Sequence, residues 1–156
     1  MIDNYLISLN ACKDAREWAK GKSWKEIFDT CHRGDWILWL YRMQENFDLR
    51  KLTLAKGHCA NTVRHLMKDE RSINAVDTAI KYGEGKCELD ELNKAAADAE
   101  SAAYADAASY AASYAASVAY AAAAASYAAA RKENQQLTAD ICRQYLPFEI
   151  WNIKED

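Results

Sequence analysis

AAADAESAAYADAASYAASYAASVAYAAAAASYAAA, residues 95–130, decides the fold class of this chain. The tract contains 22 alanines and neither glycine nor proline, and alanine has the highest helix propensity of all residues. Acidic residues, beginning with Glu88, precede the tract, and Arg131 and Lys132 follow it, as a helix dipole favours. The pattern predicts one long helix over about 88–132, continuous or gently bent.

The composition of the whole chain supports the same fold class. Its 156 residues include only five glycines and a single proline, which leaves little turn chemistry for many short strands. A chain of this length buries enough surface to fold as one domain without metals or disulfides. We expect a single all-α domain over residues 1–156, a bundle of about six to seven helices.

Capping signals predict two short helices at the start of the chain. Asn10 is a candidate N-cap for an amphipathic segment over 11–20, which Gly21 ends. Ser23 followed by Glu26 has the spacing of a capping box. The second short helix is therefore expected to begin after Ser23.

Three further helices are expected before the alanine tract. Asp35 is a candidate cap for the segment 36–43, whose density of large apolar residues marks the centre of the core. Asp48 caps a longer helix that extends to about Lys68. Ser72 begins another, which the sequence Tyr82-Gly83-Glu84-Gly85 ends because two glycines tolerate positive φ.

The C-terminal region predicts a last helix and a tail. Apolar residues recur at helical spacing over 137–146, and Pro147 stops that helix. Phe148 and Trp151 make the following segment apolar. We expect the tail over 147–156 to dock on the body of the domain.

The aromatic residues of the alanine tract are candidate binding residues. Because the Ser-Tyr-Ala-Ala unit repeats every four residues, the tyrosines spiral around the predicted helix and form no single narrow seam. They could pack inside the bundle, or one face could stay exposed for recognition, since tyrosine is enriched in binding hot spots. The candidates are Tyr104, Tyr110, Tyr114, Tyr120 and Tyr127.

Charge and cysteine content limit the class of partner and the compartment. A net charge of −3 and a sequence pI near 5.7 argue against direct nucleic-acid binding. We expect no membrane association, because no uncharged stretch contains enough large aliphatic residues to cross a bilayer. The five cysteines are scattered and form no CxxC pair, which favours a cytoplasmic location.

The sequence contains no recognised catalytic motif. It lacks a Walker loop, a GxSxG elbow and an HExxH pair. Cys31-His32 together with His58-Cys59 and His65 could supply zinc ligands, but their spacing matches no usual structural zinc site. We therefore expect no catalytic residue, no metal and no cofactor.

A family resemblance appears in the first third of the chain. The Asp-Trp-x-x-Trp-Leu core at 35–40 follows the capping-box segment 23–28 and precedes the long alanine-aromatic tract. This arrangement resembles a family of immunity proteins of bacterial polymorphic toxin systems. The resemblance implies an all-α fold and neutralisation of a toxin by binding, and relatives also occur in phage-like contexts.

The specific part of this resemblance is a short structural motif. Its members are Trp24, Asp35, Trp36 and Trp39. Trp36 and Trp39 are three residues apart and share a helical face, so we expect them in the core. The motif therefore supports the fold, and the resemblance identifies no toxin-contacting residue.

Four functions remain open from the sequence. The first is a non-catalytic inhibitor of the immunity type that binds a toxin or effector stoichiometrically. The second is a phage-encoded inhibitor of a host defence complex such as a CRISPR effector. The third is a structural protein that self-associates through the alanine-tyrosine helix. The fourth is an enzyme that unites His32, His58 or His65 with a carboxylate.

Overall fold

The chain folds into helices. The computed structural model describes the backbone of residues 2–114 and 120–151 and the side chains of residues 2–101 and 131–149. These residues form eight α-helices and no strand, which confirms the all-α class. The α-helices are α1 (Ile2–Ser8), α2 (Lys13–Ala19), α3 (Trp24–Thr30), α4 (Gly34–Arg42), α5 (Leu49–Asn61), α6 (Glu70–Gly83), α7 (Leu89–Tyr114) and α8 (Tyr120–Tyr145). Two 3-10 helices are η1 (Arg64–Leu66) and η2 (Phe148–Trp151).

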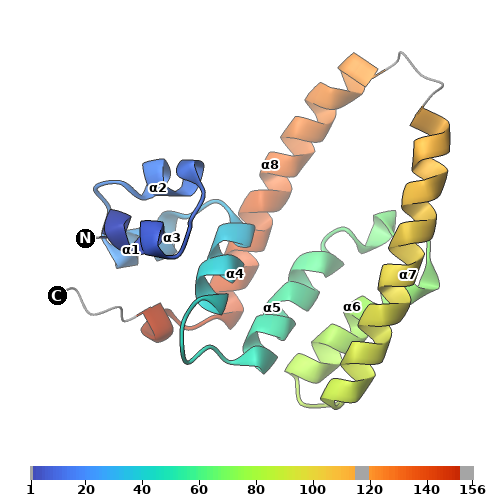
Figure 1. Ribbon diagram of the computed structural model, residues 1–156, viewed down its shortest axis with the longest axis horizontal. Coiled ribbons are helices and arrows are strands. Elements are labelled where there is room, and N and C mark those ends of the chain that lie inside the picture. Colours follow the sequence, from blue (N-terminus) through green and yellow to red (C-terminus); the bar gives the residue numbers. More distant parts are fainter. Residues whose placement is uncertain (1, 115–119, 152–156) are drawn as a thin grey trace.

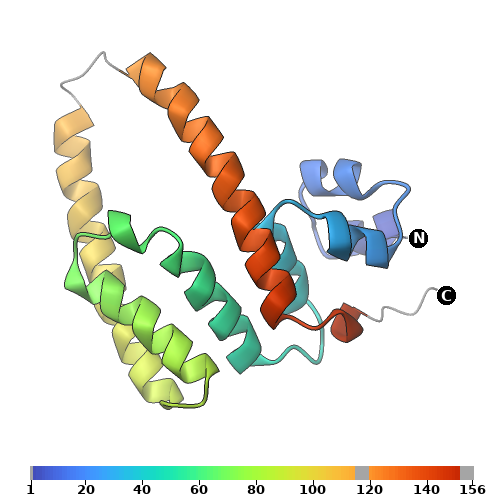
Figure 2. The same cartoon turned by 180° about the vertical axis from the view of Figure 1, so that it is seen from behind.

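The helix α8 lies in the middle of the molecule. It packs against both α4 and α5, which also contact each other, α5 packs against α6, and α6 packs against α7. The three short helices α1–α3 form a separate group on the α4 side of α8, and α7 lies at the opposite edge (Figure 1). The view from behind shows the same order of helices (Figure 2).

The expectation of one continuous helix over 88–132 is wrong. The ends of this region belong to two helices, α7 and α8, which run in opposite directions (Figure 1). α7 packs on α6 and buries Ala95, whereas α8 packs on α4 and α5 and buries Ala139 and Cys142. A straight rod of about 67 Å could not bring both ends against the same small body. The separate helix expected over 137–146 is the last part of α8.

The first helix was not expected, and it changes the role of Asn10. Asn10 has φ 58°, its N–H donates to the carbonyl of Ile7, and the N–H of Ala11 donates to the carbonyl of Leu6. This is the Schellman arrangement at the end of a helix, where asparagine tolerates the left-handed conformation. Asn10 therefore ends α1, and the residue that precedes α2 is Cys12, which makes no side-chain capping bond.

The capping box before α3 is confirmed, but the expected cap of α4 is wrong. Ser23 Oγ accepts from the N–H of Glu26, and the Glu26 carboxylate accepts from the N–H of Ser23. The Ser23 N–H and Oγ both donate to the Glu26 carboxylate, and these two hydrogen bonds lower the pKa of Glu26. α4 begins two residues earlier than expected, at Gly34, so Asp35 lies inside its first turn and the N-cap position belongs to Arg33.

Aspartates cap the two helices of the α5–α6 pair. Asp48 accepts backbone hydrogen bonds at the start of α5, as expected. The helix ends at Asn61 and not near Lys68. Asp69, not Ser72, caps α6. Aspartate and serine are both favourable N-cap residues, so residue type alone does not show whether Asp69 or Ser72 precedes α6.

Glycine permits two helices to meet at the α5–α6 crossing. A Cβ on Gly83 would lie 2.4 Å from Leu54 Cβ, and one on Gly57 would lie 2.8 Å from a side-chain carbon of Ile80. Gly83 is thus a packing residue in the last turn of α6. Of the two glycines expected to have positive φ, Gly83 and Gly85, only Gly85 has it, at 74°. The small residues bring the two backbones close together.

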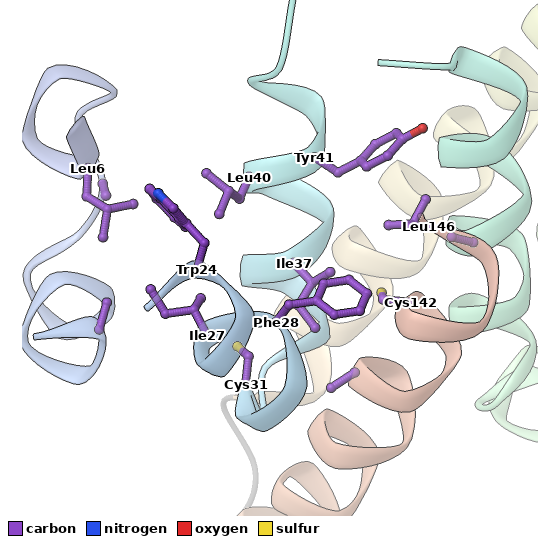
Figure 3. Packing of buried hydrophobic residues seen from close by; sticks show 14 of the residues in the cluster. Leu6, Trp24, Ile27, Phe28, Cys31, Ile37, Leu40, Tyr41, Cys142 and Leu146 are labelled. Carbon is purple, nitrogen blue, oxygen red and sulfur yellow. The ribbon is translucent and has the colours of Figure 1, made fainter. Parts of the chain in front are cut away.

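A second close helix contact lies between the start of α4 and the end of α8. A Cβ on Gly34 would lie 2.5 Å from Thr138 Oγ1 and 2.7 Å from the Thr138 carbonyl carbon. Around this contact, Ile37 is 1% exposed and Cys142 is fully buried. Figure 3 shows Phe28 and Ile37 directed towards Cys142, so α3, α4 and α8 share one core.

A single arginine fastens α3 to α8. Arg143 Nε donates to the carbonyl of Phe28 at 2.7 Å, and its Nη2 donates to the carbonyl of Cys31. Both carbonyls lie at the C-terminal end of α3, where no helical N–H reaches them. Arg143 also pairs with Asp140 on its own helix. The side chain therefore supplies donors to two carbonyls at the end of α3.

The C-terminal tail contacts the same region. The rings of Phe148 and Phe28 are 5.4 Å apart, and η2 packs against α3. Pro147 follows Leu146, which is 1% exposed. The tail residues 152–156 lie outside the described part of the chain.

Gly34→Ala tests the contact between α4 and α8. The added methyl group would overlap Thr138, so we expect a loss of about 1–3 kcal/mol of unfolding free energy, measured by urea denaturation. Gly21→Ala is the comparison, because its methyl group would meet nothing within 4 Å, so any loss there reports the strain of its φ of 76° and not an overlap. Unchanged stability of Gly34→Ala would show that α4 does not approach α8 so closely.

Arg143→Met tests the fastening of α3 to α8. Methionine keeps most of the aliphatic stem but loses two charge-assisted hydrogen bonds, so we expect a loss of about 2–3 kcal/mol in the same measurement. Arg131→Met is the matched control, since Arg131 is exposed on the same helix. Similar losses for the two variants would contradict the role of Arg143.

Candidate protein-binding surface

Three aromatic rings meet at the surface where α2 approaches α4. The ring centroids of Trp18 and Trp36 are 6.1 Å apart, and His32 lies 5.9 Å from Trp18 and 6.1 Å from Trp36. Each spacing lies in the range of attractive aromatic pairs. All three side chains are partly exposed. The rings therefore form a packed surface feature that solvent still reaches.

Two cations cover the outer rings. Lys22 Nζ lies 4.5 Å from the centroid of the Trp18 ring, and the guanidinium carbon of Arg33 lies 4.7 Å from the centroid of the Trp36 ring. Both distances are within the range of cation–π attraction. We call Trp18, Lys22, His32, Arg33 and Trp36 the tryptophan cluster.

Short hydrogen bonds fix both cations of the tryptophan cluster. Lys22 Nζ donates to the carbonyl of Trp18 at the end of α2. Arg33 Nε and Nη2 donate to the two carboxylate oxygens of Asp35 at 2.8 and 2.6 Å. These hydrogen bonds hold the pKa of Asp35 below its usual range and raise the pKa of Arg33. The surface is therefore preorganised before any partner arrives.

The tryptophan cluster rests on an apolar layer. A small cavity of about 30 Å³ lies beneath Trp18 and Trp36. Its remaining lining residues are Leu6, Ala15, Ala19, Trp24, Ile27, Cys31, Ile37, Trp39 and Leu40. The lining of this cavity is almost entirely apolar, so the rings above it rest on the hydrophobic core.

The motif residues predicted from sequence divide between core and surface. Trp24 is 5% exposed, lies between Leu6 and Leu40 (Figure 3), and has its ring 5.6 Å from that of Tyr5. Trp39 is half-buried and lines the cavity. Trp36 is half-buried in the tryptophan cluster, and Asp35 is exposed beside it. The motif thus contributes to a surface as well as to the core.

The predicted tyrosine face cannot be placed at the level of side chains. The backbone positions of Tyr104, Tyr110 and Tyr114 belong to α7, and those of Tyr120 and Tyr127 belong to α8. The side chains of all five lie outside the described part of the chain. Because the two helices run in opposite directions, the five residues do not follow one helical surface.

The candidate zinc ligands are engaged in other contacts. His32 belongs to the tryptophan cluster, whereas His58 stacks flat on Tyr145, with centroids 4.5 Å apart. Cys59 Sγ lies 3.9 Å from Cys142 Sγ, and this contact together with burial raises the pKa of the Cys142 thiol. Within residues 2–101 and 131–149, no group of three or more metal-ligating side chains is assembled.

Sequence analysis missed three members of the tryptophan cluster, Trp18, Lys22 and Arg33. Trp18 was read only as part of an amphipathic segment, and Lys22 follows the glycine that ends it. Their spacing of four residues is a local signal for a cation over a ring. The approach of α2 to α4 is a tertiary contact that this spacing does not reveal.

Comparisons with known proteins identify no relative of this chain. The search against family models, curated sequences and solved structures returns no match for the chain. Among the described residues, no helix is both long and apolar enough to cross a bilayer.

Alanine substitution separates the core tryptophan from the surface one. We expect Trp24→Ala to reduce the unfolding free energy by about 3–5 kcal/mol, as for a fully buried aromatic residue. Trp36→Ala should cost about 2 kcal/mol, because its ring is only half-buried. Urea denaturation of both variants measures the difference. An equal loss at Trp36 would make it a core residue and remove it from the surface.

Proposed function

We propose that this chain is a non-catalytic inhibitor of the immunity type, which neutralises a toxin or effector by stoichiometric binding through the tryptophan cluster. The observation that supports this most is the group of partly exposed rings and cations fixed on one face. Tryptophan and arginine are the residues most enriched in protein-binding hot spots. The similarity of residues 23–40 to immunity proteins supports the same class.

Preorganisation makes this surface suitable for tight binding. The rings are held by one another and by Lys22 and Arg33, so few rotamers remain to be frozen when a partner binds. Each side chain immobilised on binding costs about 0.5–1.5 kcal/mol. The other large exposed apolar residues, such as Leu66 and Leu137, come from separate helical segments, which is ordinary for a protein surface.

Co-expression with toxins tests the proposal. The chain is produced in bacteria together with each of a panel of toxins from polymorphic toxin systems, and growth is measured. We expect one toxin to be neutralised by the wild-type chain and to regain its toxicity with Trp18→Ala. A complex of the two purified proteins with one-to-one stoichiometry should accompany the rescue. Failure of every toxin in the panel would count against the immunity role.

A matched variant distinguishes loss of the surface from loss of the fold. Phe47 is half-buried and has Arg42 4.4 Å from its ring centroid, so it repeats one aromatic–cation pair of the cluster elsewhere. Phe47→Ala should leave growth rescue intact. If Phe47→Ala and Trp18→Ala abolish rescue equally, stability and not the tryptophan cluster determines the outcome.

A further inference from the structure

A second feature lies directly beside the tryptophan cluster. A cavity of about 310 Å³ opens between the start of α1 and the connection from α2 to α3. Its volume is at the lower end of the range for ligand pockets. Three basic residues and one acidic residue line it, namely Arg16, Lys20, Lys22 and Asp3.

One of the basic groups has an unused donor. Arg16 Nε is buried and has no hydrogen-bond partner among the described residues. A buried donor without an acceptor destabilises the structure that contains it. A ligand that brings an acceptor to this guanidinium would remove part of that cost, so the unliganded cavity favours an anion.

The neighbouring hydroxyl group does not compete for the same anion. Ser23, which also lines the cavity, donates through its N–H and Oγ to the Glu26 carboxylate at 2.7 and 2.8 Å. The donors left for a ligand are therefore those of Arg16, Lys20 and Lys22. Asp3 offsets one of these charges, so the cavity keeps a net positive charge that attracts an acidic group such as a carboxylate.

Lys22 connects the cavity to the tryptophan cluster. Its side chain lines the cavity while its Nζ lies over the Trp18 ring. A partner that covers Trp18 therefore brings its neighbouring residues to the mouth of the cavity. The apolar ring of Trp18 and the charged cavity are adjacent, so together they select a partner by both shape and charge.

We propose that this cavity binds a carboxylate side chain of the partner, so that the chain recognises an acidic segment which also contacts Trp18. This proposal rests on the proposed function and names the chemistry of the partner. Arg16 is the group that orients the carboxylate, and Lys20 and Lys22 supply further positive charge.

The direct probe is a capped tetraglutamate peptide, titrated into isotopically labelled protein. We expect saturable NMR shifts of the Arg16 Nε–H and of the backbone amides of Gly21 and Lys22 at millimolar peptide, and their weakening with added salt. Capped tetraglutamine should produce no such shifts. Absence of saturable shifts, or equal shifts with tetraglutamine, would overturn the proposal, as would tighter binding of inorganic phosphate than of tetraglutamate.

Charge variants provide the matched controls. Arg16→Gln and Lys20→Gln should each weaken tetraglutamate binding by about tenfold, and Asp3→Asn should strengthen it. Lys56→Gln removes the same charge from an exposed position on α5 and should change nothing. Equal weakening by Lys56→Gln and Lys20→Gln would reduce the effect to net charge and contradict a specific site.

The two proposals fail in different ways. If a toxin is found, Lys20→Gln should weaken its complex about tenfold without lowering the melting temperature. A complex that is lost with Trp18→Ala but unchanged with Lys20→Gln would leave the inhibitor function standing and overturn the carboxylate site. Tetraglutamate binding without any neutralised toxin would support the site and count against the inhibitor function.

Discussion

The close packing of α4 and α3 on the end of α8 is the constraint on which the rest of the structure depends. Gly34 leaves no room for a side chain against Thr138, and Arg143 holds the last carbonyls of α3. One short stretch of α8 thus fixes the direction of α4 and the position of α3. The same end of α8 also packs on α5, which connects this core to α6 and α7.

The candidate binding surface is a consequence of that packing. His32 and Arg33 lie in the connection between α3 and α4, so the two helix positions determine where these side chains point. Trp36 follows one turn into α4, and Trp18 reaches it from α2. A surface built on fixed helix ends needs little rearrangement to bind, which is the property that a stoichiometric inhibitor requires.

Local rules predicted much of this fold, and tertiary contacts explain the errors. Alanine content and capping residues such as Ser23 and Asp48 predicted helices correctly, because these effects act within one turn. Asn10 was misassigned, since asparagine suits both the start of a helix and the left-handed residue after one. The separation of α7 from α8 and the meeting of Trp18 with Trp36 depend on contacts between distant segments. Of the five residues of the tryptophan cluster, the motif therefore contains only Trp36, and His32 was considered only as a zinc ligand or catalytic group.

Hydrogen exchange of the native protein tests most directly whether the end of α8 organises the structure. Amides that open only on global unfolding exchange last, and they mark the most stable part of a fold. We predict that these are the amides of Ala139 to Leu146 in and after α8, together with Ile37 to Tyr41 in α4. Last exchange in α6 and the start of α7, with earlier exchange at the end of α8, would contradict this central role.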